Sequence, residues 1–115
     1  MAIETDDQGR TFSVDDDTGG RKEIKLARFD LLPVGPLTEL AEHYGKGAFK
    51  YESRNWEKGD DWSNSFAAAL RHAFQFWAGE DTDEETGSKH VIAAAWHFLA
   101  LAEFMETHKE KDDRP

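Results

Sequence analysis

Large apolar side chains recur every three or four residues in two long stretches of the sequence, and glycines separate these stretches from their neighbours. The first stretch runs through Phe66, Ala69, Leu70, Ala73, Phe74 and Trp77 and ends at Gly79. The second runs through Val91, Ala94, Ala95, Phe98, Leu101, Ala102 and Met105. This spacing places the apolar side chains on one face of a helix. It therefore predicts helices over residues 66–77 and 91–105.

A shorter stretch with the same spacing follows Pro36 and contains Leu37, Leu40, Ala41 and Tyr44. It predicts a first helix that ends at Gly45 or continues, with a kink, to Tyr51. Three helices predict an all-α fold, a small helical bundle. Because such a bundle is thin and its last helix is strongly aromatic, we expect a homodimer or homotetramer to complete the core.

The two ends of the chain differ in composition from the helical region. Residues 1–22 are rich in aspartate, contain almost no large apolar residue and include the Gly19-Gly20 pair, which favours a disordered acidic arm. Residues 25–33 are richer in large apolar side chains, but Pro33 and Pro36 disfavour an early helix, so we expect an extended N-terminal strap across the core. Residues 23–106 then form a single helical domain, and residues 107–115 form a disordered charged tail.

Composition excludes several classes of protein. The longest apolar run, Val91 to Trp96, is far shorter than the roughly 20 residues that cross a bilayer, and no apolar leader opens the chain. We therefore expect a soluble cytoplasmic protein with no membrane partner. The net charge of −10 disfavours binding to duplex nucleic acid. Without cysteine, a metal site must use Asp, Glu or His, which favours a hard cation such as Mg²⁺ or Mn²⁺.

Candidate metal ligands gather between the second and third predicted helices. The segment carries His72, then Glu80, Asp83 and Glu85, then His90. The end of one helix, the loop and the start of the next helix can bring them together, and a divalent cation would relieve the repulsion among the carboxylates. The alternative is a solvated acidic turn that caps the following helix.

The remaining histidines and Arg71 each have two interpretations. His43 and His108 are read as packing or capping residues. His97 lies two helical turns after His90, so it either faces the same groove or belongs to the core. Arg71 is either a salt-bridge partner of the acidic loop or a clamp for phosphate.

Two further segments carry candidate site residues. Glu39 and Glu42 are three residues apart on the first helix and repeat the spacing of Glu80 and Asp83, so two such pairs can cage metal ions; the alternative is an ordinary solvated face. The loop after this helix mixes cations, an amide and an aromatic ring that suit phosphates and a stacked base. Its candidate substrate-binding residues are Lys50, Arg54, Asn55, Trp56 and Lys58. Trp56 alternatively anchors the loop to the core.

Several of these motifs, in this order, resemble the phage dATP/dGTP diphosphohydrolase family. The matching blocks are Arg28-Phe29-Asp30-Leu31-Leu32-Pro33, Gly47-Ala48-Phe49-Lys50-Tyr51, Asn55-Trp56-Glu57-Lys58-Gly59, Leu70-Arg71-His72, Gly79-Glu80-Asp81-Thr82-Asp83 and Glu85-Thr86-Gly87 with His90. The resemblance implies a link to MazG-like all-α nucleotide pyrophosphatases, which are Mg²⁺-dependent and cleave between the α- and β-phosphates. It also implies a phage origin, and hence the cytoplasm of an infected host cell. In MazG-like enzymes the acidic pairs lie on neighbouring helices, whereas here Glu80 and Asp83 follow Gly79 in a predicted loop.

The resulting hypothesis is a metal-dependent pyrophosphohydrolase that cleaves purine deoxynucleoside triphosphates to the monophosphate and pyrophosphate. The metal role is assigned to Glu80, Asp83, Glu85 and His90, with Glu39 or Glu42, and the catalytic role to His72, Glu80 and Asp83. The phosphates are assigned to Lys50, Lys58 and Arg71. The alternatives are a nucleotide-binding sponge without hydrolysis and an acidic inhibitor of a host protein.

Overall fold

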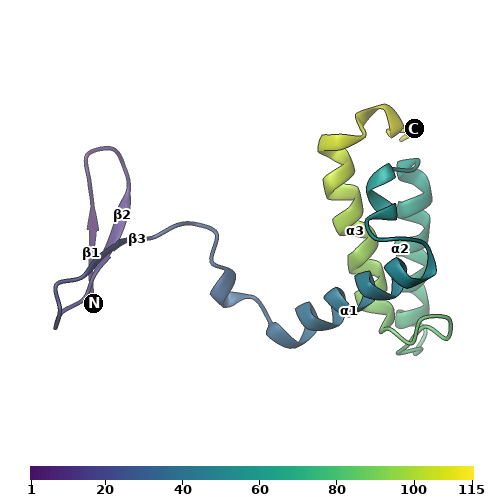
Figure 1. The fold of residues 1–115 in the computed structure, drawn as a ribbon, viewed down its shortest axis with the longest axis horizontal. Coiled ribbons are helices and arrows are strands. Elements are labelled where there is room, and N and C mark those ends of the chain that lie inside the picture. The colour runs from purple at the N-terminus through teal and green to yellow at the C-terminus, as the bar shows by residue number, and fades with distance from the viewer. The chain divides into compact units, whose positions relative to one another are not determined.

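The computed structural model describes residues 1–115 as two compact units, Met1–Leu32 and Pro33–Pro115. The first unit is a small sheet and the second is helical (Figure 1). Most of the chain is therefore helical, as predicted, but the fold also contains strands. None of the helices is long and apolar enough to span a membrane.

The first unit is a three-stranded antiparallel sheet in the order β1 (Ala2–Thr5), β2 (Thr11–Val14) and β3 (Arg21–Glu23). Thr5 pairs with Thr11 across the first turn, and Val14 pairs with Arg21 across the second. No residue of this unit is buried. The structure differs here from the disordered arm predicted over residues 1–22.

The aspartates that favoured disorder in the sequence are turn residues in the structure. The Asp6 carboxylate accepts hydrogen bonds from the backbone N–H groups of Gln8 and Arg10, at 3.0 and 2.8 Å. Asp15 accepts in the same way from the residues that follow it in the second turn. Gly9 and Gly19 supply the positive φ angles, 80° and 71°, that these two turns require. Aspartate and glycine are common both in tight turns and in disordered segments, so composition alone does not separate the two.

The predicted strap contains a short turn and is not extended throughout. After β3, a 3-10 turn spans Phe29–Leu31. The side chains of Leu26 and Phe29 are 100% and 79% exposed.

The second unit contains the three predicted helices, α1 (Val34–Lys50), α2 (Trp62–Trp77) and α3 (His90–Thr107). α3 packs along α2 and also contacts α1 (Figure 1). Short elements connect and follow the helices: a 3-10 turn at Asn55–Lys58 after α1, and another at Lys109–Lys111 after α3.

The first helix begins earlier than its apolar pattern predicts. It begins at Val34, so Pro36 lies inside the first turn instead of ahead of the helix. Proline is tolerated there because the first N–H groups of a helix have no intrahelical partner. The helix also continues through Gly45 and Gly47 to Lys50.

Small and aromatic residues make the core of the helical unit. Ala69 of α2 and Ala93 of α3 are fully buried, which lets these two helices approach closely. Trp62, Ala100 and Phe104 form a second cluster, with Trp56 packed against it. Other aromatic side chains of these helices stay in solvent, most of all Trp77, which is 86% exposed.

The sequence predicts a disordered tail over residues 107–115, but in the structure this C-terminal segment is bonded to the start of α2. The Trp62 indole N–H donates to the His108 carbonyl at 3.1 Å, and the Ser63 N–H donates to the Asp113 carboxylate at 2.9 Å. Asp113 thus fills the role of an N-cap for α2, whose own preceding residue, Asp61, makes no side-chain cap bond.

Candidate metal centre

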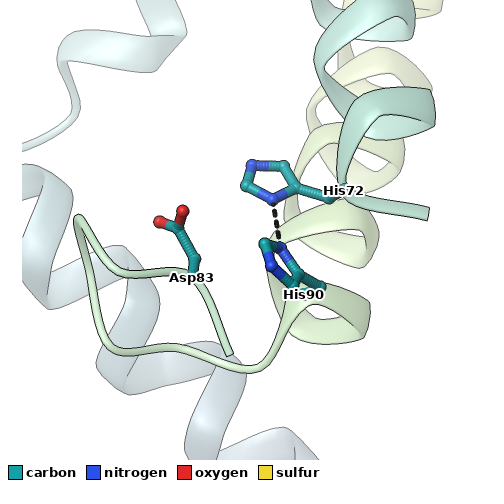
Figure 2. A group of neighbouring side chains, drawn as sticks. All are labelled: His72, Asp83 and His90. Carbon is teal, nitrogen blue, oxygen red and sulfur yellow. Dashed lines mark hydrogen bonds between the residues drawn. The ribbon is translucent and has the colours of Figure 1, made fainter. Parts of the chain in front are cut away.

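Three predicted site residues meet where α2, the following loop and α3 converge. His72 lies on α2, Asp83 lies in the loop, and His90 is the first residue of α3. One potential ligand atom from each residue lies within 4.8 Å of the other two (Figure 2). We call these three residues the triad. Two imidazole rings and one carboxylate form a set of ligands that binds divalent metals in proteins.

The loop between α2 and α3 is tightly folded, which fixes Asp83. Gly79 and Gly87 have φ angles of 104° and 74°, so the chain can turn sharply at both ends of the acidic segment. The Asp83 N–H donates to the Ser88 carbonyl at 2.8 Å, and the Gly87 N–H donates to the Asp83 carbonyl at 2.7 Å. The acidic segment is therefore an ordered turn.

The Asp83 carboxylate is held by Thr86. The Thr86 hydroxyl and N–H donate to Asp83 Oδ2 at 2.9 and 3.2 Å, and Oδ1 has no hydrogen bond. Partial burial opposes ionisation, but these hydrogen bonds and the nearby imidazoles outweigh it and lower the pKa of Asp83. The residue thus presents an ionised carboxylate with one free oxygen.

The two imidazoles are in direct contact. His72 Nδ1 and His90 Nδ1 are 2.9 Å apart, so without a metal one of them donates to the other (Figure 2). Two nitrogens that bind one metal at about 2.1 Å and at right angles lie about 3 Å apart, so the same arrangement suits a pair of adjacent ligands. Burial, with the positive charge of Arg71, lowers the pKa of His72 and keeps its ring in the neutral form that binds metals.

Glu80 lies beside the triad without belonging to it. Its Oε2 is 3.4 Å from His90 Nε2, which is buried and has no hydrogen-bond partner. Ligating histidines commonly donate their other ring N–H to a carboxylate, and this contact orients the ring. The position of Glu80 suits that role better than the ligand role predicted from the sequence.

One face of α1 contacts the loop that carries Asp83. The residues of this face follow the helical spacing of four, three and four, and we call them the polar stripe: Glu39, His43, Lys46 and Lys50. His43 Nδ1 and Lys46 Nζ lie 2.8 and 2.9 Å from the Ser88 hydroxyl, two residues ahead of His90. The stripe thus brings a neutral imidazole and a cation close to the triad.

The other predicted metal ligands lie outside the triad. Glu39 forms an ion pair with Lys89 at 3.0 Å, and Glu85 forms one with Lys50. Glu42 is exposed and makes no hydrogen bond or ion pair, because it lies off the polar stripe. The predicted Glu39 and Glu42 pair is therefore split between two faces of α1.

The predicted phosphate-binding cations are mostly paired with carboxylates. Lys50 pairs with Glu85, Lys58 with Glu52, and Arg54 with Glu57. Arg71 takes part in none of the ion pairs, and its charge acts on the adjacent His72. Among the predicted cations, only Arg71 is both close to the triad and uncommitted.

A large cavity opens next to the triad. It has a volume of about 740 Å³ and lies between α1, the loop after it, the start of α2 and α3. We call it the aromatic cavity, after four rings that line it: Tyr44, Trp56, Trp96 and Phe104. His97 also lines it, and its ring stacks on that of His72 with centroids 5.8 Å apart. Burial is the main reason that the pKa of His97 falls to about 4.

A protein-family model described as "dATP/dGTP diphosphohydrolase, N-terminal" matches residues 16–114. The chain belongs to this family. A search of curated proteins and a search of solved structures each gave no significant match. The diphosphohydrolase family match covers the helical unit with all of the triad, and confirms the family resemblance found in the sequence.

Some residues close to the triad were not predicted from the sequence. The sequence pattern does not single out Lys46, and it predicts only a packing or capping role for His43. The signal that reveals them is their spacing from Glu39 and Lys50 along α1, but it has meaning only once the contact with the loop is known. Asn55 and Trp56, predicted as substrate-binding residues, line the aromatic cavity together with Arg54.

Proposed function

We propose that this chain binds a divalent transition metal at the triad and hydrolyses purine deoxynucleoside triphosphates to the monophosphate and pyrophosphate. One observation carries the proposal: in a chain of the dATP/dGTP diphosphohydrolase family, His72, Asp83 and His90 bring three potential ligand atoms within 4.8 Å of one another. The family description names an N-terminal domain, so activity of this chain by itself is part of the proposal. Action in the cytoplasm of an infected host cell remains a prediction.

The donor set favours Mn²⁺ over Mg²⁺, which was the other candidate. Magnesium prefers oxygen ligands, whereas imidazole suits transition metals and a carboxylate suits manganese. When bound, such a metal polarises a phosphoryl oxygen and activates water for attack. Two ligands from helices and one from an ordered turn leave the remaining coordination positions to substrate and water.

The residues of this chain have distinct proposed roles around that metal. His72, Asp83 and His90 hold it, and Thr86 fixes the orientation of the Asp83 carboxylate through the bond to Oδ2. Glu80 orients His90 through Nε2, on the other side of the ring from the Nδ1 that faces His72. This assignment replaces the ligand and catalytic roles of Glu80 with a positioning role.

Two cations are proposed for the phosphates. Arg71 has no carboxylate partner and precedes His72, and Lys46 donates only to the uncharged Ser88 hydroxyl. Neither cation has to break an ion pair before it binds a phosphate. Lys50 and Lys58 would first have to leave Glu85 and Glu52, so we assign them a smaller contribution. Cations near the leaving pyrophosphate stabilise the charge that develops on it.

The test is incubation of the purified chain with each of the four deoxynucleoside triphosphates and Mn²⁺ or Mg²⁺, with separate detection of pyrophosphate and phosphate. We expect pyrophosphate from dATP and dGTP, faster with Mn²⁺, and loss of turnover by two to three orders of magnitude in Asp83→Asn. Glu84→Gln is the matched control, because Glu84 is an exposed acid of the same loop and has no partner. Release of phosphate would indicate a different bond cleaved, and binding without product would favour a nucleotide sponge.

A further inference from the structure

The aromatic cavity is too large and too open to be a packing defect. Its volume of about 740 Å³ lies within the range of sites that bind small molecules, roughly 300–1,000 Å³. Its rings contact one another around it: Tyr44 lies edge-on to Trp56 at 5.9 Å and to Trp96 at 5.7 Å between centroids. Trp56 in turn lies 6.1 Å from Phe104. Such walls suit a flat aromatic ligand.

Two glycines of α1 line the cavity, although no packing contact within the chain requires glycine at either position. Glycine inside a helix is less stable than alanine, and Gly45 and Gly47 both lie well inside α1. A Cβ atom added at either position would meet no heavy atom within 4 Å. Their lack of side chains therefore serves no close packing inside the chain, and both residues line the cavity. The space that they leave is available to a ligand.

Buried polar atoms without partners point to the same place. In the whole chain, three buried side-chain atoms lack a hydrogen-bond partner, namely His90 Nε2 of the triad, Trp96 Nε1 and His97 Nδ1. Trp96 and His97 both line the cavity. Native proteins rarely leave such atoms unpaired. Neither nitrogen is reached by solvent in this conformation, so a ligand in the cavity would pair with either one only after that ring turned. The Asn55 side chain also makes no hydrogen bond within the chain and lines the cavity.

The charges around the cavity disfavour a phosphate ligand. Arg54 is the one cation among the lining residues, and it is paired with Glu57. Glu52, which is paired with Lys58, and Asp60, which has no ion pair, add two carboxylates to the lining. An anionic group would be repelled here, whereas a neutral ring with hydrogen-bonding edges would not.

We propose that the aromatic cavity binds the base and sugar of the purine nucleotide whose phosphates lie at the triad; this inference rests on the proposed function. The rings of Trp56, Tyr44 and Trp96 contact the base. Both purines offer N7 as an acceptor, and an asparagine amide pairs well with adenine N6 and N7. His97 joins the two subsites, because it lines the cavity and stacks on His72.

Tryptophan indole N–H signals in ¹⁵N NMR spectra, assigned by Trp→Phe variants, test this directly. The ligands are deoxyguanosine, deoxyadenosine and thymidine, added without phosphate and in the presence of EDTA. We expect purine nucleosides to shift the Trp56 and Trp96 signals and thymidine to act more weakly. The Trp62 indole is the internal control, because it is already bonded to the His108 carbonyl.

Variants on α1 supply the matched comparison. We expect Gly47→Leu to weaken purine nucleoside binding at least about tenfold, because the new side chain fills the cavity, and Trp56→Ala to weaken it roughly ten- to a hundredfold. Gly35→Leu is the control, since Gly35 lies on the same helix with equal space but does not line the cavity. Thermal melts establish that each variant is folded, and Gly47→Ala replaces Gly47→Leu if the larger residue prevents folding.

The outcomes separate this inference from the proposed function. Unshifted Trp56 and Trp96 signals, or equal nucleoside affinity in Gly47→Leu and Gly35→Leu, would overturn the assignment of the cavity. Mn²⁺ with tripolyphosphate tests the triad without a base, and its stabilising effect should persist in Gly47→Leu and vanish in His72→Ala. Nucleoside binding at the cavity without any response to Mn²⁺ or turnover would support the cavity assignment and overturn the metal-dependent function.

Discussion

Replacement of Asp83 by asparagine tests whether Asp83 is a metal ligand or only a structural residue of the turn. Asparagine keeps the shape of the side chain and an oxygen that can still accept from Thr86. The two hydrogen bonds from Thr86 then go to a neutral acceptor instead of a charged one, and a bond to a charged acceptor stabilises the fold by about 1 kcal/mol more than a neutral bond. We therefore expect the metal-free Asp83→Asn variant to lose about 1–2 kcal/mol of unfolding free energy.

The metal-dependent part of the stability should behave differently. A ligand at 100 times its dissociation constant stabilises the folded state by about 2.7 kcal/mol. For a helical unit of this size, each kcal/mol raises the melting temperature by about 4–8 °C, so saturating Mn²⁺ should raise it by roughly 10–20 °C. In Asp83→Asn and in His72→Ala this increase should disappear.

Circular dichroism melts with and without Mn²⁺ measure both quantities in one series. Glu84→Gln is the control and should keep the full increase, because it removes a charge from the same loop without touching the triad. Mg²⁺ should give a smaller increase than Mn²⁺, since two of the three ligands are imidazoles. A full Mn²⁺ response in both Asp83→Asn and His72→Ala would refute the triad as the metal site.

Three further predictions concern parts of the chain outside the triad. The pKa of His108 is raised because its ring donates to the Glu57 carbonyl at 2.8 Å and contacts Glu110 at 3.1 Å. The charged ring therefore stabilises the fold fully below the unfolded pKa of about 6.5, and this stabilisation is lost as pH rises through the higher folded pKa. His108→Gln should make the melting temperature vary less between about pH 6 and pH 8, and an unchanged pH profile would contradict this prediction. Deletion of residues 1–20 should leave the helical unit folded, because no residue of the first unit is buried, and a large fall in melting temperature would show that the sheet is needed. The exposed side chains of Phe74, Trp77 and Met105 predict a homodimer or homotetramer, and light scattering that gives a 13.1 kDa particle at micromolar concentration would exclude it.

The parts of the fold that the sequence predicts are those fixed by local periodicity. α2 and α3 appear where apolar residues recur at helical spacing, and the family motifs lie on and between them. Their short connection forces the end of one helix to lie near the start of the other. The proximity of His72 and His90 follows from that connection, whereas the position of Asp83 depends on how the loop between them folds.

What the sequence did not predict depends on contacts between distant segments. The two hairpin turns of the first unit use aspartate and glycine, which are equally common in disordered chains. The attachment of the C-terminal segment depends on a capping bond between Ser63 and Asp113, fifty positions apart. No periodic pattern in the sequence predicts a bond between residues so far apart.

The polar stripe on α1 shows why a spacing of three residues does not select the face of a helix that meets a neighbouring loop. The spacing of Glu39 and Glu42 repeats that of Glu80 and Asp83, yet the side that faces the loop is marked by Glu39, His43 and Lys46. A spacing of three alone does not choose between two neighbouring faces of a helix, whereas a run of four, three and four defines one. In this structure the chosen face carries a neutral imidazole and a cation toward the triad, and its acid is already paired with Lys89. A face of that composition suits a triphosphate better than a second metal ion, so α1 is expected to contribute to substrate binding and the triad to hold the metal alone.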